Sequence, residues 1–420
     1  MNKFLMNTNS NELTKLRLQE ICDHFIEYPS TRIIAMQNKR FMKILLKCLH
    51  RTDDEELKGD IRKCLSVIGY VNYPKGCGVR ILSIDGGGTR GMMGLEVLQA
   101  LEDALGGPKV AEMFDHIVGV STGGIIAILL GAKKYSIKHC KEIYMSISKD
   151  LFTQGRFSGV SGLLLSHSYY NTKKWIDILI KAIGDDWTIL DSCRSLNAPK
   201  LSIISCVVNA SMLQPYIFRN YEYPPGRDGH FRGDCRDMIW QALQASTAAP
   251  GYFEEVLLGS VLHQDGGVLA NNPTAIALHE ARMLWPNERF QCVVSVGNGH
   301  HVNELDTTHI KSSTGVQEKI TRIVDSATDT ELVHLCMHDL LPANTYFRLN
   351  PYMSFPYTLD EIDPDKLAQM QKDARLYIRR NHAKIEDTAE ALLIRPSKMQ
   401  LISRQLRDFS ERHGLYTRSF

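Results

Sequence analysis

The sequence predicts an α/β protein, a three-layer α/β/α domain with a mostly parallel sheet, flanked by helices towards both ends of the chain. Strand-like runs alternate with helix-like runs between residues 79 and 300, which is typical of a parallel sheet covered on both faces. Two of these strand-like runs end in glycine-rich turns, the place where α/β proteins put their functional groups. The 420 residues suffice for such a domain and a smaller satellite.

The composition is that of an ordinary folded protein, with 44% hydrophobic and 23% charged residues. Lys and Arg number 49 against 47 Asp and Glu, so the charge gives no reason to expect nucleic acid as a partner. Ten scattered cysteines without a Cys-x-x-Cys pair argue against a zinc ribbon or a disulfide scaffold. No apolar run has signal-peptide or membrane-span character, so we expect an intracellular protein.

Residues 1–75 are predicted to be helical and possess the weak features of an armadillo-like array, which could bind a protein partner or mediate self-association. Apolar residues recur there at helical spacing, for example Leu57, Ile61, Leu65 and Ile68. Thr52 precedes an acidic first turn and is the expected helix cap.

The Pro- and Gly-containing stretch 73–78 predicts a boundary, after which the pattern changes to that of the α/β domain over 79–300. We expect strands at 79–84, 114–120, 200–208, 215–221, 255–263 and 290–297. Helices are expected after residues 91 and 121 and around 136–150, 172–183, 235–245 and 273–284. Residues 301–420 are predicted to be a mainly helical extension with amphipathic stretches near 364–393 and 397–413.

The pentapeptide Gly119-Val-Ser121-Thr-Gly123 lies between a predicted strand and a predicted helix. A serine at such a sharp turn is pushed out at the sheet edge, and the glycines allow the strained backbone and the close packing that the turn needs. The helix that follows directs its N-terminal dipole towards negative charge beside the serine. The alternative is a tight turn whose serine only caps the helix.

The turn Asp-Gly-Gly-Gly-Thr-Arg-Gly offers two nucleotide-binding interpretations, and both lack a decisive residue. Gly86, Gly88 and Gly91 fit the dinucleotide pattern, but the second strand ends in Gly-Val-Ser where an acidic residue is needed. Met92 and Met93 stand where a phosphate loop needs Lys and Ser or Thr. The glycines are better placed to offer backbone N–H groups to an oxyanion, unless the turn merely requires positive φ.

A serine nucleophile needs a base. Four histidines follow the serine in the order that an α/β-hydrolase would use, but none lies in a telling motif: His279, His300, His301 and His334. Asp265 is more suggestive, because it ends a predicted strand and is followed by two glycines. By itself, Asp-Gly-Gly is also a common turn.

Four motifs in this order and spacing resemble the patatin-like phospholipases: GGGTRG at 86–91, GVSTG at 119–123, ALQASTAAPGYF at 242–253 and DGGVLANNP at 265–273. The flanking segments 69–91 and 326–351 are similar to the gamma group of calcium-independent phospholipases A2 in that family. The resemblance extends over about residues 57–393.

The resemblance implies a patatin-like catalytic domain over 79–300 with a Ser–Asp dyad, in which Ser121 is the nucleophile and Asp265 the base. It implies calcium-independent hydrolysis of fatty-acyl esters of glycerophospholipids, of the phospholipase A1/A2 and lysophospholipase type, through an acyl-enzyme and without a cofactor or metal. The amides of Gly86, Gly87 and Gly88 would hold the oxyanion. The supporting glycines would be Gly91, Gly119, Gly123, Gly266 and Gly267.

Two further features concern the substrate. Arg90 could bind the phosphate of a phospholipid, since a guanidinium can hold two phosphate oxygens, or it could form an ordinary salt bridge. Residues 155–170 join Phe, Leu and Tyr to flexible Gly and Ser, which suits a lid on a membrane surface or plain core packing. The resemblance implies peripheral association with organelle membranes of the endoplasmic reticulum, mitochondrion or peroxisome.

Three alternatives stay open at the level of sequence. The glycine loop could bind a nucleotide, the chain could be an inactive scaffold that binds a partner through its N-terminal helices, or it could be a neutral-lipid lipase. The presence of Ser121, Asp265 and the glycine loop together argues against the scaffold.

Overall fold

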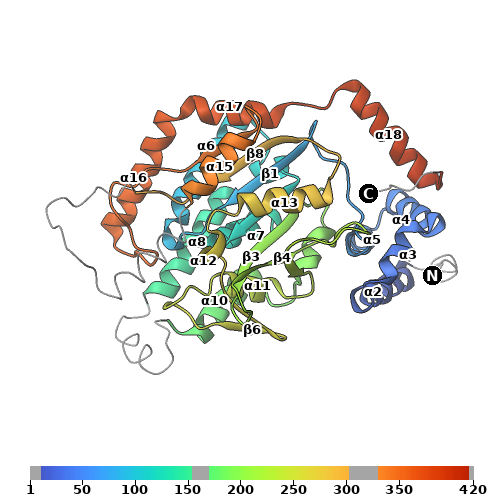
Figure 1. The fold of residues 1–420 in the computed structure, drawn as a ribbon, viewed down its shortest axis with the longest axis horizontal. Coiled ribbons are helices and arrows are strands. Elements are labelled where there is room, and N and C mark those ends of the chain that lie inside the picture. Colours follow the sequence, from blue (N-terminus) through green and yellow to red (C-terminus); the bar gives the residue numbers. More distant parts are fainter. Residues whose placement is uncertain (1–10, 154–169, 302–329, 416–420) are drawn as a thin grey trace.

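The computed structural model describes residues 11–153, 170–301 and 330–415 (Figure 1). The segment 155–169, the larger part of the predicted lid, lies outside the described residues. Among the described residues, no helix is both long and apolar enough to cross a bilayer.

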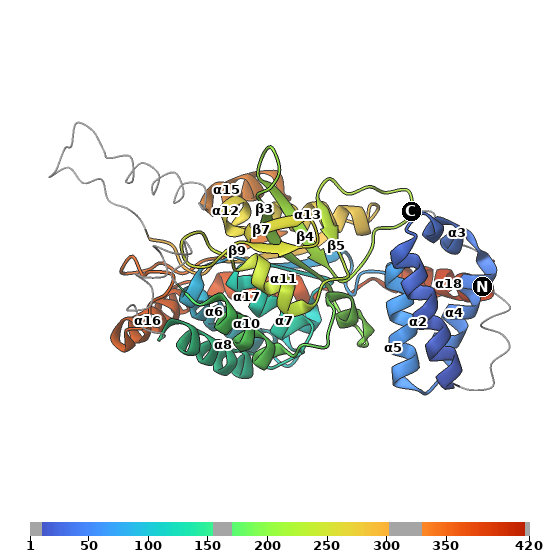
Figure 2. The same cartoon turned by 90° about the horizontal axis from the view of Figure 1, so that it is seen from below.

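The N-terminal helices form a small bundle at one end of the molecule, and Leu190, Cys193 and Cys235 complete its apolar core (Figure 2). They are α2 (Asn11–Glu27), α3 (Thr31–Gln37), α4 (Lys39–Arg51) and α5 (Glu55–Val67). The predicted cap Thr52 is wrong: Asp54 caps α5 by accepting from the amides of Glu56 and Leu57. The hydroxyl of Thr52 instead accepts from the amide of Asp54, at 3.2 Å.

The central sheet has the strand order β5-β4-β3-β2-β1-β8-β9. Its strands are β1 (Val79–Ile84), β2 (His116–Val120), β3 (Lys200–Val207), β4 (Gln214–Arg219), β5 (Arg232–Asp234), β8 (Phe290–Val296) and β9 (Tyr346–Leu349). The run from β3 through β2, β1 and β8 to β9 is parallel, which confirms the predicted sheet, whereas β4 is antiparallel to β3.

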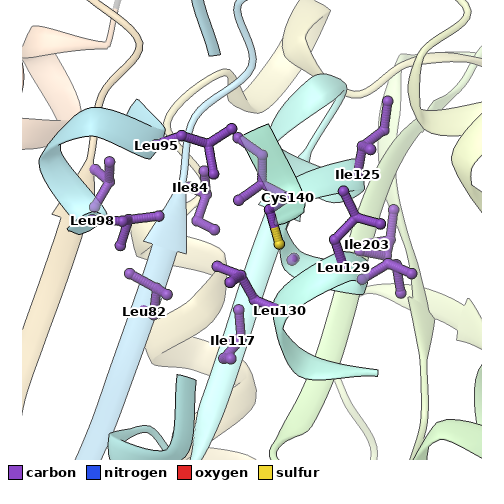
Figure 3. Packing of buried hydrophobic residues seen from close by; sticks show 14 of the residues in the cluster. Leu82, Ile84, Leu95, Leu98, Ile117, Ile125, Leu129, Leu130, Cys140 and Ile203 are labelled. Atoms are coloured by element: carbon purple, nitrogen blue, oxygen red, sulfur yellow. The ribbon is translucent and has the colours of Figure 1, made fainter. Parts of the chain in front are cut away.

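Helices cover both faces of this sheet and give the predicted three layers. One face packs under α6 (Gly91–Leu105), α7 (Thr122–Gly131), α8 (Ile137–Phe152), α10 (Thr172–Ile183), α11 (Ile239–Ser246) and α17 (His382–Leu393). Leu82 and Ile84 of β1 point towards this side and meet Leu95 and Leu98 of α6 (Figure 3). Ile81 of β1 points to the other face, which α13 (Thr274–Leu284) covers.

The remaining short helices are η1 (Gly88–Arg90), η2 (Val110–Met113), η3 (Ile189–Arg194), α12 (Gly267–Ala270) and α15 (Glu331–Leu340). The two amphipathic stretches near the C-terminus are α16 (Pro364–Arg380) with α17, and α18 (Lys398–His413). Helix α18 attaches through polar side chains: Gln400 donates to the carbonyl of Cys77, and Arg404 to those of Pro74 and Gly76. Its apolar residues face solvent, among them Met399, Ile402, Leu406 and Phe409.

Two elements differ from the sequence expectation. The sheet continues beyond residue 300, because β9 pairs in parallel with β8 and forms the edge of the sheet. The single strand expected at 255–263 is a hairpin of β6 (Val256–Leu258) and β7 (Val261–Asp265). Its two-residue turn contains Gly259 at φ +59°, a conformation that glycine adopts without strain.

The hairpin places β7 directly in line with β2. One edge of β3 pairs with β4. Its other edge pairs with β2 over residues 200–204 and with β7 over residues 205–207. Val120 is opposite Ile204, and Asp265 is opposite Ser205, the next residue of β3. The end of β2 and the end of β7 therefore meet head to head in the same lane of the sheet.

Candidate active site

Ser121 lies in a sharp turn between β2 and α7, with φ 53° and ψ −129°. Positive φ is costly for a serine, so the surrounding contacts must hold it in place. Its amide donates to the hydroxyl of Ser246, at 2.8 Å. The turn also needs glycine on both sides: a Cβ on Gly119 would lie 2.3 Å from the carbonyl oxygen of Gly123, and one on Gly123 would lie 2.4 Å from that of Asp85.

The side chain of Ser121 reaches Asp265 directly. Its Oγ donates to Oδ2 of Asp265 at 2.5 Å, and both residues are buried, with 9% and 6% of their surface exposed. The second carboxylate oxygen accepts from the amide of Gly267, at 2.7 Å. Gly266 passes so close to β3 that a Cβ there would lie 2.3 Å from the carbonyl oxygen of Ile204. The structure thus brings together the two residues predicted as nucleophile and base.

Burial raises the pKa of Asp265 to about 6, because desolvation disfavours the charged carboxylate. The hydrogen bonds from Ser121 and Gly267 act in the opposite direction and hold the pKa below what burial alone would give. A carboxylate with a pKa near 6 is a stronger base than a solvated one and is still mostly ionised at neutral pH.

The glycine loop lies against the serine. A Cβ on Gly86 would be 3.0 Å from the Cβ of Ser121, and Gly88 has φ +57°. One detail of the sequence prediction is wrong: the amide of Gly86 donates to the carbonyl of Asn271, at 3.3 Å, so it is not open to an oxyanion. Among the hydrogen bonds of the described residues, none uses the amide of Gly87 or Gly88. These two amides remain the candidate oxyanion donors.

A buried ion pair that sequence reasoning missed supports this loop from below. Asp85, just before the glycines, lies 2.7 Å from a guanidinium nitrogen of Arg348 on β9, and both side chains are almost fully buried. Arg348 also donates to the hydroxyl of Ser295 and to Glu331, at 3.0 and 3.2 Å. Desolvation raises the pKa of Asp85 to about 6, although Arg348 counters this shift. The position of Asp85 directly before the glycine motif could have drawn attention to this residue. Arg348 gave no such signal, because it lies in a region that was expected to be helical.

Arg90 lies at the end of the glycine loop and is half-buried. Its Nε donates to the carbonyl of Gly87, at 3.1 Å. Within the described part of the chain it has no carboxylate within ion-pair distance, so the salt bridge considered above is not observed there. Burial lowers the pKa of Arg90, since a charged group loses hydration there.

The histidines considered from the sequence are engaged elsewhere. His279 accepts from the backbone amide of His230, at 3.3 Å, and His334 contacts the hydroxyl of Tyr346, at 3.3 Å. His300 and His301 pack against Tyr352. Within the described residues, no group of three or more His, Cys, Asp or Glu side chains could hold a metal ion.

The fold and site define an α/β/α protein with a buried Ser–Asp pair beside a glycine-rich loop. Residues 82–278 match the family model of patatin-like phospholipases, so the chain contains a patatin-like domain. It is 40% identical to calcium-independent phospholipase A2-gamma of Mus musculus over 400 residues, which cover 95% of this chain and 51% of that protein. The chain thus spans about half the length of this curated relative.

More distant relatives match as well. Phospholipase A I of Arabidopsis thaliana is 30% identical over 370 residues, covering 76% of this chain and 28% of that protein. Among solved structures, VipD from Legionella pneumophila matches with a TM-score of 0.39 and 12% identity over 80% of this chain and 75% of that one. A likeness at that level does not bear on the site.

Proposed function

We propose that the protein is a calcium-independent phospholipase that hydrolyses fatty-acyl esters of glycerophospholipids. The observation that carries the proposal is the 2.5 Å hydrogen bond from Ser121 to the buried carboxylate of Asp265, beside two backbone amides that no hydrogen bond among the described residues uses. The similarity to proteins named as phospholipases supports the substrate class.

In the first half of the reaction, Oγ of Ser121 attacks the ester carbonyl carbon while Asp265 accepts its proton. The carbonyl oxygen becomes an oxyanion next to the amides of Gly87 and Gly88. A lost oxyanion donor typically costs about 3–4 kcal/mol, so these amides should matter strongly. When the tetrahedral intermediate collapses, the ester C–O bond breaks, and the leaving alkoxide takes the proton back from Asp265.

In the second half, water attacks the acyl-serine. Asp265 accepts a proton from this water, and the collapse of the second intermediate returns a proton to Ser121 and releases the fatty acid. The same carboxylate therefore acts as base and then acid in each half. Its pKa, which burial raises to about 6, suits both directions near neutral pH.

Arg90 is proposed to hold the phosphate of the lipid. Its guanidinium lies at the loop that carries the candidate oxyanion donors and has no carboxylate partner among the described residues. A planar guanidinium can donate to two phosphate oxygens at once, which would place the ester of a phospholipid in a fixed register.

We also propose that the protein works peripherally on the membranes of an organelle, since its substrate is a bilayer lipid. The relevant catalytic unit would be the predicted domain 79–300 together with β9, because β9 supplies the ion pair beneath the loop. The N-terminal bundle would serve a protein partner or self-association.

The test is fatty-acid release from phosphatidylcholine vesicles in the presence of a calcium chelator. Wild type should release fatty acid, and neither Ser121→Ala nor Asp265→Asn should do so. A wild type that is active on triacylglycerol but not on phospholipid would support the neutral-lipid lipase instead. Nucleotide binding that survives Ser121→Ala, with no lipid hydrolysis by wild type, would contradict the proposal.

A further inference from the structure

Two neighbouring hairpins, β3–β4 and β6–β7, extend away from Asp265 and expose apolar side chains. The turn between β3 and β4 carries Met212 and Leu213, which are 73% and 46% exposed, and β6 carries Leu257, which is 64% exposed. The side chain of Asn209 joins the two turns: it donates to the carbonyl of Ser260 and accepts from an amide of β7, at 2.9 and 3.0 Å. Leu257 therefore lies on the hairpin that ends in the catalytic carboxylate.

A second apolar group follows Asp265 directly. Helix α12 begins at Gly267 and exposes Leu269. The side chain of Asn272 then donates to the carbonyl of Thr330, at 3.0 Å, so the start of α15 lies next to this segment. Leu332 in the first turn of α15 is 64% exposed, and α15 buries none of its residues.

The third group borders the glycine loop. The amide of Thr89 donates to the carbonyl of Leu359, at 2.8 Å, so the loop 350–362 lies against the candidate oxyanion donors. Phe355 in this loop is 58% exposed. Large exposed apolar side chains thus surround the site on three groups of elements: the two hairpins that lead to Asp265, helices α12 and α15 after it, and the loop 350–362 beside the glycines. We call Met212, Leu213, Leu257, Leu269, Leu332 and Phe355 the apolar rim.

The segments that carry the apolar rim contain no Lys or Arg. This holds for 208–213, 254–262, 266–271, 331–340 and 350–362, whereas Asp and Glu occur in three of them. Attraction to anionic lipids depends on clustered Lys and Arg close to the membrane. Such a cluster exists in α4, which has five Lys and Arg and no Asp or Glu, but α4 belongs to the N-terminal bundle.

We propose that the apolar rim is the membrane-docking surface of the enzyme, and that it binds zwitterionic or neutral lipid surfaces by apolar burial. This inference rests on the proposed function, which requires access to a lipid in a bilayer. Large exposed apolar side chains that gather around a site commonly mark such contacts. Because the rim segments contain no Lys or Arg, adding anionic lipid does not strengthen binding, and salt does not abolish it.

The test measures vesicle binding in a Ser121→Ala background, so that the vesicles stay intact. Leu257→Glu and Phe355→Glu should each lower the affinity for phosphatidylcholine vesicles by about tenfold, because a charge replaces an apolar side chain that the bilayer buries on binding. The matched control is Leu406→Glu, because Leu406 is also 64% exposed. It lies on α18, which is anchored to the segment before the start of β1 (Figure 1). This control should bind vesicles like the parent protein.

Three results would overturn the proposal. One is an equal loss in the Leu406→Glu control, another is binding that needs about 30 mol% phosphatidylserine or disappears at about 0.5 M salt. The third is a rim variant that binds vesicles normally but changes from dimer to monomer in sedimentation, which would assign the rim to a second copy of this chain.

Hydrolysis of a short-chain phospholipid below its micelle concentration separates this inference from the proposed function. The rim variants with Ser121 intact should hydrolyse this monomeric substrate at the wild-type rate. If wild type itself fails to hydrolyse it, the proposed function fails, whatever the vesicle experiment shows. If a rim variant loses both activities equally while its Tm stays unchanged, the rim acts in catalysis rather than in docking.

Discussion

The hydroxyl of Ser121 and the carboxylate of Asp265 lie 2.5 Å apart because β2 and β7 pair with consecutive residues along the same edge of β3 and run towards each other. The register of both strands against β3 fixes this approach, so the pair depends on backbone hydrogen bonds as well as on its own side chains. A geometry held in this way is largely set before a substrate binds.

Removal of either member of the pair should abolish hydrolysis with the fold intact. Ser121→Ala and Asp265→Asn should each lower kcat by on the order of 10⁴-fold, the scale seen when the base or nucleophile of a serine hydrolase is lost. The measurement is single-turnover acyl transfer together with the Tm of each variant. Burst formation of an acyl-enzyme by Asp265→Asn at the wild-type rate would remove Asp265 from the role of base.

Activity should decline as the pH falls through about 6, because burial raises the pKa of Asp265 to about 6 and only the ionised form can accept the proton. The measurement is kcat/KM against pH with an uncharged monomeric ester. Burial also raises the pKa of Asp85 to about 6, so Asp85→Asn is the control. If this variant lost the acidic limb, Asp85 would be its source.

The same raised pKa of Asp265 has a stability consequence of opposite sign. Its carboxyl group has an unfolded pKa of about 3.9, so between about pH 4 and 6 the folded state binds the proton more strongly. The Asp265 contribution to the free energy of unfolding therefore increases as the pH falls through this window. Wild type should gain stability relative to Asp265→Asn between about pH 6 and 4, measured by urea unfolding of both proteins. A constant difference between the two would contradict the shift.

Arg348→Met should destabilise the protein by about 3–5 kcal/mol, because it leaves the buried carboxylate of Asp85 without its partner. The double variant Asp85→Asn/Arg348→Met should recover part of that loss, since no unpaired charge remains. Chemical unfolding of the two single variants and the double variant forms the required cycle. Additive losses would show that the two side chains do not stabilise the fold as a pair.

Arg90→Ala should lower kcat/KM for a phospholipid by about tenfold or more and leave a neutral ester of equal chain length nearly unaffected. Arg90→Lys should keep part of the phospholipid activity, because it keeps the charge but not the planar fork. Competitive inhibition by a soluble phosphodiester gives a second readout. An equal loss with both substrates would place Arg90 in the support of the loop, where it donates to Gly87.

Local signals in the sequence predict the parallel strands and place Ser121 and Asp265 at strand ends, whereas their roles as nucleophile and base are implied by the resemblance to patatin-like phospholipases. Buried apolar runs mark β1, β2, β3 and β8, and glycines mark the turns where Ser121 and Asp265 lie. β9 gives no such signal: it is four residues long and carries Arg348 in its centre. A charge in a buried strand is tolerated here because Asp85, far away in the sequence, forms an ion pair with Arg348.

Other details depend on contacts that sequence patterns do not contain. The amide of Gly86 is taken by the carbonyl of Asn271, which only the folded turn brings close. Thr52 and Asp54 are both good capping residues. Asp54 is the one that caps α5, because the helix begins at Glu55. The armadillo-like character of the N-terminal bundle and the role of residues 155–170 stay predictions.

The lane shared by β2 and β7 has a consequence for the newly made chain. A polypeptide synthesised only as far as α7 already possesses Ser121 but has no base for it, since Asp265 emerges much later. On the proposed mechanism, hydrolysis begins only after β3 has paired along both edges and the β6–β7 hairpin has docked. The onset of esterase activity during refolding should therefore report the completion of this sheet. A collapsed intermediate in which β7 has not yet paired with β3 should show no esterase activity.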